Sequence, residues 1–186
     1  MTQLTLITPE ESYREQILAY RAEFLEAGDY LAGCAGLDKA PSFGEWLQAV
    51  RENSREETVR EGLVPASNYM AIRQADNRLV GFIDLRHRLN DFLLQFGGNI
   101  GYSVRPCERR QGYAKEMLAL ALLKCRERGM CRVLVTCRKE NFASARTIQS
   151  CGGVLENEGF KEGTLYQRYW ITLSPWDGNF SGDFMR

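Results

Sequence analysis

The residues from 104 to 114 have the types and spacing that suit the binding of an anion. They lie between a predicted strand and the most regular predicted helix of the chain. Pro106 ends the pairing of the strand, and Gly112 allows close backbone approach where the helix begins. The unpaired N–H groups at this helix start, together with the charges of Arg109 and Arg110, predict a nest for a pyrophosphate. The spacing matches neither a P-loop nor a dinucleotide-binding glycine motif.

The charge distribution supports a local anionic ligand. The chain has 24 Lys and Arg against 24 Asp and Glu, which disfavours a globally basic nucleic-acid binder. Residues 105–146, however, contain eleven basic side chains against four acidic ones. A solvated basic turn is the plain alternative for the 104–114 segment, and RNA binding through 105–146 is a weaker hypothesis.

Composition points to one globular domain. The chain has 186 residues, of which 44% are hydrophobic and 26% charged. We expect a single domain over residues 1–173 and a C-terminal tail over 174–186. Six cysteines without a CxxC pair, and one histidine, disfavour a zinc site and predict reduced thiols in a cytoplasmic protein. No signal peptide and no apolar run of membrane-spanning length is visible.

Hydrophobic periodicity predicts the elements that position these residues. Predicted helices run from a Thr8 cap to Gly28, over Phe43–Arg55, over Tyr113–Arg128 and from Asn141 to Cys151. Predicted strands are Leu4–Ile7, Tyr69–Arg73, Leu79–Leu85, Gly98–Val104, Cys131–Cys137, Val154–Glu156 and Leu165–Leu173, with a loop over 158–163. The crossover through helix 113–128 makes strands 98–104 and 131–137 a parallel pair among antiparallel hairpins. We therefore predict a mixed α/β (α+β) domain with a mostly antiparallel sheet flanked by helices.

Two spaced motifs resemble those of a known family. Arg109-x-x-Gly112-x-Ala114 resembles the Q/R-x-x-G-x-G/A signature of the GNAT superfamily of acyl-CoA-dependent N-acyltransferases. The stretch from Asn141 through Ile148 to Gly152 resembles that family's N-x-x-A/S-x-x-x-Y-x-x-x-G segment. The resemblance is tight over residues 68–172, and the run 98–106 is similar to an uncharacterised bacterial branch of predicted acetyltransferases.

The resemblance implies acetyl-CoA as cosubstrate and an amine as acceptor. The central parallel strands would splay around the acyl-CoA, and the strand backbone would pair with its pantetheine arm. The loop residues Arg109 to Ala114 would bind the pyrophosphate. The helix that begins at Asn141 would contact the pantetheine or the adenine end of the coenzyme. The coenzyme-binding residues implied in this way are Ile100, Tyr102, Val104, Arg109, Arg110, Gln111, Gly112, Tyr113, Ala114, Asn141 and Ser144.

This sequence departs from the family pattern at the catalytic positions. Many relatives have a carboxylate base on the strand equivalent to 98–104, which has none here, and a tyrosine acid where this chain has Ile148. Substitutes must come from elsewhere, and we name three candidates: His87, Asp84 and Tyr102. His87 is the only side chain with an ordinary pKa near neutrality, and Tyr102 is the best placed tyrosine for the leaving thiolate.

Other roles stay open at this point. Cys107 or Cys137 could in principle form a covalent acyl intermediate.

The leading hypothesis is an N-acetyltransferase in which the primary amine of a small molecule or peptide attacks acetyl-CoA directly. The alternative is a non-catalytic acyl-CoA sensor or interaction module. The acidic N-terminal third suits a cationic amine; we expect no metal, nucleic acid or membrane partner, and a homodimer is left open.

Overall fold

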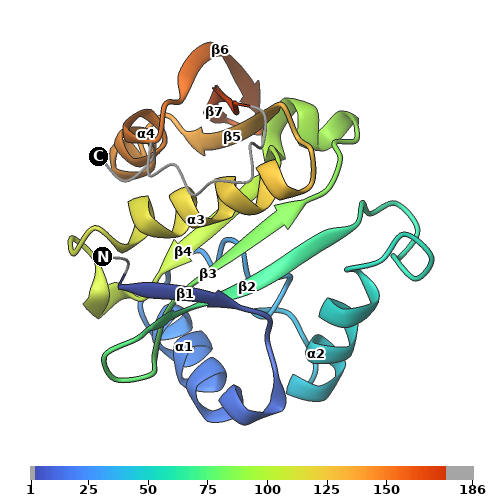
Figure 1. Cartoon of the computed structure of the whole chain (residues 1–186), viewed down its shortest axis with the longest axis vertical. Helices are drawn as coiled ribbons and strands as arrows, with labels where there is room; N and C mark the ends of the chain where they lie inside the picture. Colours follow the sequence, from blue (N-terminus) through green and yellow to red (C-terminus); the bar gives the residue numbers. More distant parts are fainter. Residues whose placement is uncertain (1–2, 175–186) are drawn as a thin grey trace.

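The computed structural model describes residues 3–174, through which a seven-stranded sheet runs in the order β1-β2-β3-β4-β5-β7-β6 (Figure 1). The strands are β1 (Leu4–Ile7), β2 (Ala66–Arg73), β3 (Arg78–Arg86), β4 (Ile100–Val104), β5 (Arg132–Arg138), β6 (Val154–Lys161) and β7 (Thr164–Thr172). The helices are α1 (Arg14–Glu26), α2 (Phe43–Glu52), α3 (Tyr113–Glu127) and α4 (Phe142–Ser150), with short helical turns η1 (Glu11–Tyr13), η2 (Leu93–Gly97) and η3 (Pro106–Glu108).

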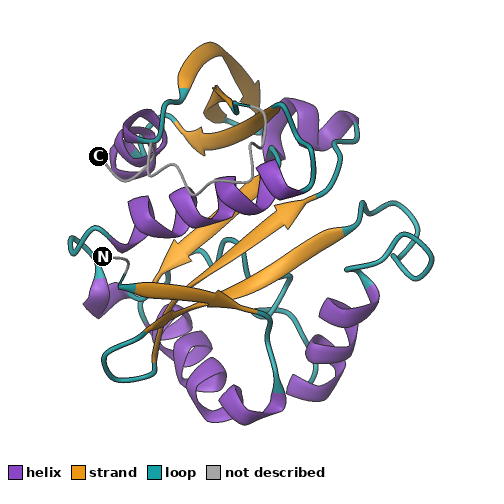
Figure 2. Cartoon of the chain, viewed as in Figure 1, coloured by secondary structure: helices purple, strands orange, loops and turns teal. Residues whose placement is uncertain are grey.

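Every neighbouring pair of strands is antiparallel except β4 and β5, which are parallel. Helices α1 and α2 cover one face of the sheet, and α3 and α4 lie against the other (Figures 1 and 2). The predicted fold class is therefore confirmed. Within residues 3–174 no helix has both the length and the apolar character that crossing a membrane requires.

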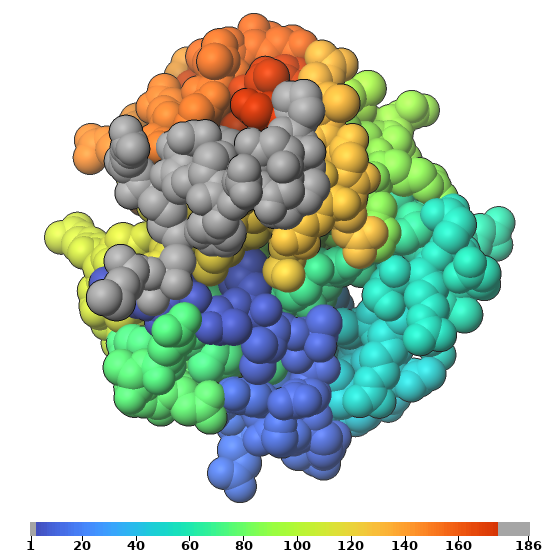
Figure 3. Space-filling model, viewed as in Figure 1, coloured from blue at the N-terminus to red at the C-terminus, as the bar shows by residue number. Residues whose placement is uncertain are grey.

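Alternation along the central strands divides the core between the two faces. Ile83 and Leu85 of β3 lie in the cluster beneath α3. Phe82 points the other way and packs edge-on against Tyr20 and Trp46, at centroid distances of 5.2 and 6.0 Å. The surface follows the same division, with α1 (blue) and α2 (cyan) at one end and α4, β6 and β7 (orange to red) at the other (Figure 3).

Three predicted boundaries are wrong. The first helix does not start from a Thr8 cap: Glu10 is extended, and the chain turns through η1 before α1 begins at Arg14. The last hairpin is longer than predicted, because Phe160 pairs with Leu165 and only Glu162 and Gly163 form the turn. Strand β6 is the edge of the sheet, so its exposed residues lack the alternation that marks a half-buried strand. Residues 93–97, over which no element was predicted, form η2.

The irregular segment 28–41 is held against the centre of the sheet on the α1–α2 face. The Ser103 hydroxyl donates to the carbonyl of Ala32 at 2.5 Å, and the Asn68 amide donates to that of Gly33 at 2.6 Å. Gly33 has a φ of 74° and lies so close to β4 that a Cβ there would overlap the carbonyl of Gly101. A side chain at this position is excluded both by backbone conformation and by space.

We expect Gly33→Ala to destabilise the fold more than Gly36→Ala does. Both glycines have a left-handed φ, 74° and 76°, so both substitutions impose a strain of about 1 to 3 kcal/mol. Only at position 33 does the methyl group meet backbone, since nothing lies within 4 Å of a Cβ at Gly36. The extra overlap should cost about 2 kcal/mol more in the free energy of unfolding, measured by urea denaturation. Equal losses would contradict the close contact with β4.

Candidate functional site

Strands β4 and β5 separate almost as soon as they meet. Their register contains one pair, Ile100 with Val135, although β4 is five residues long and β5 seven. On its other edge β4 pairs with β3 along its whole length, from Leu85–Ile100 to Gly81–Val104. The sheet therefore opens beside β4, beyond Ile100.

The backbone of β4 presents hydrogen-bonding groups to this opening. Arg86 N donates to Asn99 O at 2.7 Å and Arg105 N donates to Val80 O at 2.8 Å, so the odd-numbered residues face β3. The N–H and C=O groups of Tyr102 and Val104 consequently point toward the side of β5. Because β4 and β5 have already separated at this point, β5 does not pair with them. Strand N–H and C=O groups that no neighbouring strand pairs require another partner.

The narrow end of the opening is closed by Asn99, which is 3% exposed. Its side-chain oxygen accepts from Leu134 N at 2.9 Å, and its amide nitrogen donates to Arg86 O at 3.2 Å. One side chain thus joins β3, β4 and β5. Nothing in the sequence pattern assigns a role to Asn99.

The wide end of the opening leads to the turn between η3 and α3. Arg110 and Gly112 both have left-handed backbone, with φ of 63° and 83°, and Gly112 is the N-cap of α3. No side chain caps this helix. The amides of its first turn, which begins with Tyr113 and Ala114, therefore receive no hydrogen bond from a capping side chain. Left-handed residues followed by uncapped helix amides are the kind of backbone arrangement that an anion nest requires.

The side chains of this turn divide between structural bonds and solvent. Arg109 is bound to Asp29 at 2.8 Å, donates to Val104 O at 3.2 Å and lies over the ring of Phe24. Gln111 donates to Glu108 at 3.1 Å. Arg110 is exposed and forms no ion pair with any other residue of 3–174. It is therefore the cation of this turn that is available to an anion.

Tyr102 reaches across to α4. Its hydroxyl lies 2.9 Å from Ser144 Oγ, and Asn141 caps the same helix by accepting from Ser144 N at 3.0 Å. Burial raises the pKa of Tyr102 well above its usual value, and the hydrogen bond to Ser144 opposes that rise. Burial also raises the pKa of the nearby Cys137 thiol to about 11. Both groups are protonated at neutral pH, which argues against Cys137 as a nucleophile.

Asp84 lies on the opposite face of the sheet from Tyr102. It is 7% exposed, accepts from Gly101 N at 3.0 Å and pairs with Arg86 at 3.1 Å. Burial raises the pKa of this carboxyl, while Arg86 and the Gly101 N–H oppose the rise. A buried carboxylate with a raised pKa beside β4 is suited to taking up a proton.

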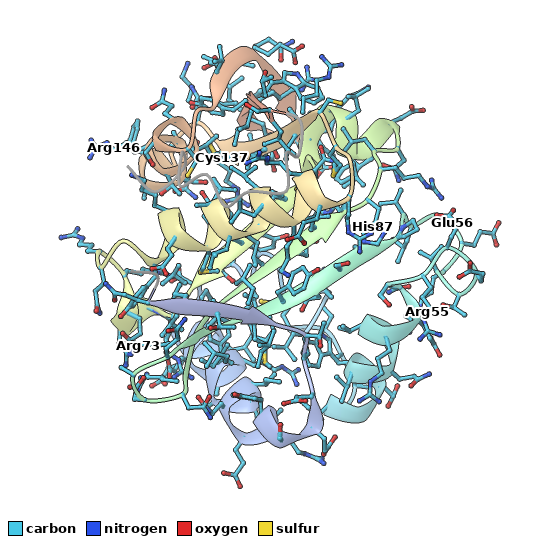
Figure 4. The ribbon with its side chains drawn as sticks, viewed as in Figure 1. Arg55, Glu56, Arg73, His87, Cys137 and Arg146 are labelled. Atoms are coloured by element: carbon cyan, nitrogen blue, oxygen red, sulfur yellow. The ribbon has the colours of Figure 1, made fainter. Side chains whose placement is uncertain are left out.

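His87 lies away from both Asp84 and Tyr102. Its Nε2 lies 2.8 Å from Ser67 Oγ, which also accepts from Arg128 at the end of α3, at 3.0 Å. In Figure 4 His87 lies toward Glu56, away from Cys137. The structure thus does not bring His87, Asp84 and Tyr102 together. Nor, among residues 3–174, do three or more His, Cys, Asp or Glu side chains gather where they could hold a metal ion.

Glu108 is the other residue that sequence analysis missed. It is 7% exposed, although it lies in a polar turn, and Arg73, Arg78 and Gln111 all bind it. The signal was present in the sequence: Glu108 is the one acidic residue in the run from Arg105 to Arg110.

Comparison with known proteins agrees with this geometry. The family model for the acetyltransferase (GNAT) domain matches residues 4–154. No curated protein matches the chain. The solved structures that resemble it include an acetyltransferase from Salmonella typhimurium that modifies the N-terminal serine of ribosomal protein L7/L12, with 20% identity, a TM-score of 0.65 and coverage of 94% of this chain and 97% of that one.

Two further structures show the range of such neighbours. One is a ribosomal L7/L12 alpha-N-protein acetyltransferase in complex with coenzyme A, with 19% identity, a TM-score of 0.64 and coverage of 93% and 96%. The other is a chimera of spermidine N-acetyltransferase from Vibrio cholerae with hSSAT, with 17% identity, a TM-score of 0.61 and coverage of 91% and 95%. At these identities the likeness shows the fold.

We expect acid to destabilise the protein partly through His87. Burial, and then the charge of Arg128, lower the pKa of His87 below its usual 6.5, against the opposing charge of Glu56. As the pH falls from 7 to 5, the unfolded chain therefore takes up a proton that the folded chain does not, and stability is lost. His87→Gln keeps an acceptor for Ser67 and should lose less stability over this range in urea denaturation at each pH. A loss equal to that of the wild type would contradict the lowered pKa.

Proposed function

The chain belongs to the acetyltransferase (GNAT) domain family, and on that premise we propose that it transfers the acetyl group of acetyl-CoA to a primary amine. The observation that supports this most directly is the opening beside β4, which runs from Asn99 to the nest around Gly112. It offers unpaired strand backbone at one end and anion-binding amides at the other. A diphosphate joined to an amide-bearing arm is the ligand that suits both.

In this proposal the coenzyme lies along β4. The backbone groups of Tyr102 and Val104 pair with the pantetheine arm in place of β5, and Ile100, already paired with Val135, marks its inner limit. The diphosphate lies at Arg110 to Ala114, where Arg110 supplies the charge and Gly112 the close approach. Arg109 holds the turn to Asp29, and Ser144 and Asn141 border the arm from α4.

The chemistry is attack of the amine nitrogen on the acetyl carbonyl carbon, with cleavage of the carbon–sulfur bond. The bound substrates need positioning, and β4 backbone N–H groups polarise the carbonyl. We assign Asp84, through water, to the uptake of the amine's proton and Tyr102 to proton donation toward the leaving sulfur. His87, which is bonded to Ser67 on β2, is given no role in this chemistry.

The acceptor class follows from charge and from the neighbours. Two of the similar structures are named for acetylation of a protein N-terminus, and a third for spermidine. The N-terminal third of the chain is acidic, and its helices α1 and α2 cover the face of the sheet on which Asp84 lies. We therefore propose a peptide N-terminus or a cationic small amine as acceptor. The six cysteines are free thiols, which suits a reducing cytoplasm.

One set of observations favours a non-catalytic acyl-CoA sensor as the second candidate. Asn99 is committed to closing the sheet, and Ile148, fully buried, cannot donate a proton. Neither position offers acid or base chemistry. A sensor would use the same nest and the same β4 backbone.

The experiment that separates the two is free-thiol release from acetyl-CoA with a panel of amines: a serine-initiated peptide, spermidine, an aminoglycoside and lysine. We expect turnover with at least one amine. Tyr102→Phe should then lower kcat about tenfold or more while the KM for acetyl-CoA stays within about twofold, because the proton donor is lost and the backbone groups that pair with the coenzyme are kept. Coenzyme binding without turnover on any amine would support the sensor instead.

Gly112→Val should raise the KM for acetyl-CoA about tenfold or more and leave kcat nearly unchanged. The φ of 83° at Gly112 disfavours valine by about 1 to 3 kcal/mol, so the nest has to rearrange. Gly129→Val, at the other end of α3, is the matched control. Gly129 has a φ of 74° and, like Gly112, nothing within 4 Å of an added Cβ. If both variants bind acetyl-CoA equally well, the diphosphate does not bind at Gly112.

A further inference from the structure

We propose that Glu108 is the positioning residue of the diphosphate loop, that is, of residues 109–112: it fixes the loop's shape and does not itself contact the coenzyme. The inference rests on the proposed function, because it takes the loop to bind a diphosphate. Nothing in the family motif, which begins at Arg109, includes this residue.

The contacts of Glu108 connect the loop to a distant hairpin. Its carboxylate accepts a hydrogen bond from Arg73 Nη1 at 2.7 Å and forms an ion pair with Arg78, whose Nε lies 2.8 Å away; the two arginines come from the two strands of the β2–β3 hairpin. Arg73 is held in turn by Asp76 at 2.7 Å and donates to the Tyr113 hydroxyl at 3.1 Å. Figure 4 shows Arg73 where this hairpin approaches the β4–α3 segment. The charge of Glu108 is therefore compensated while the residue stays nine-tenths buried.

The same carboxylate acts on the loop itself. Gln111 lies between the two left-handed residues, Arg110 and Gly112, and its side chain donates to Glu108 Oε2 at 3.1 Å. Arg110 is not a glycine, so its φ of 63° needs support from its surroundings. Besides the bonds of Arg109 to Asp29 and Val104, this is the side-chain bond that ties the loop to the body of the protein. Glu108 thus holds the middle of the nest in place.

Electrostatics alone gives the opposite expectation. Glu108 is a negative charge close to where a diphosphate would bind, and its removal would leave Arg73 and Arg78 with less compensation. If only charge mattered, neutralising Glu108 would strengthen coenzyme binding. If Glu108 positions the loop, neutralising it weakens binding, because the amides no longer converge. The sign of the change decides between the two.

The test compares Glu108→Gln with Asp76→Asn, using calorimetric affinity for coenzyme A. Asp76→Asn removes one negative charge that pairs with the same arginine, Arg73. The Asp76 side chain contacts no residue of the loop. We expect Glu108→Gln to weaken coenzyme A binding about fivefold or more, and Asp76→Asn to change it less than twofold. Thermal unfolding of both variants checks that the fold persists. Unchanged or tighter binding by a folded Glu108→Gln overturns the inference.

Gln111→Ala provides a second variant in case Glu108→Gln does not fold. Gln111 is exposed, so the substitution removes the tie to Glu108 without changing any charge or the core. We expect it to weaken coenzyme A binding about threefold; unchanged affinity counts against the inference. The outcome for the proposed function is distinct. If the wild-type protein binds no coenzyme A, both proposals fail, whereas normal wild-type binding with indifferent variants removes only the role of Glu108.

Discussion

The site depends on the fact that β4 has a partner along one edge only. A strand inside a sheet must satisfy its N–H and C=O groups, and β5 satisfies those of β4 only at Ile100. Asn99 fixes where the two strands part, because its side chain bonds to the backbone on both sides. The β4–α3 turn then starts at the open end, so that exposed amides of a helix and unpaired groups of a strand line one path.

Ion pairs within the protein neutralise part of the positive charge of the basic segment, residues 105–146. The sequence shows eleven basic against four acidic residues over 105–146. In the folded chain, Arg105 pairs with Glu23 and Arg109 with Asp29, both from α1 or just after it. These arginines join α1 to the end of β4 rather than facing a ligand. The charge available at the nest is therefore much smaller than the local excess implies, and the orientation of backbone amides has the larger share in selecting an anion.

The sequence was sufficient for the element order, the sheet type and the family, because periodicity and a spaced motif are local. It was insufficient for the catalytic residues. Asp84 and His87 are three apart, but strand alternation directs them to opposite faces, and the hydroxyl partner of His87 comes from Ser67 on β2. The burial of Glu108 depends on arginines about 30 residues earlier, which no spacing rule connects to it. Edge strand β6 was predicted too short since both of its faces are largely solvated.

The contact of Gly33 with Gly101 has a thermodynamic consequence. Segment 28–41 packs on one face of β4, whereas the opening lies along the edge of that strand. Because even a Cβ at position 33 would overlap the carbonyl of Gly101, β4 has no room to move toward 28–41. The open edge of β4 is therefore preorganised, so that little conformational entropy remains to be lost when a new partner pairs with it.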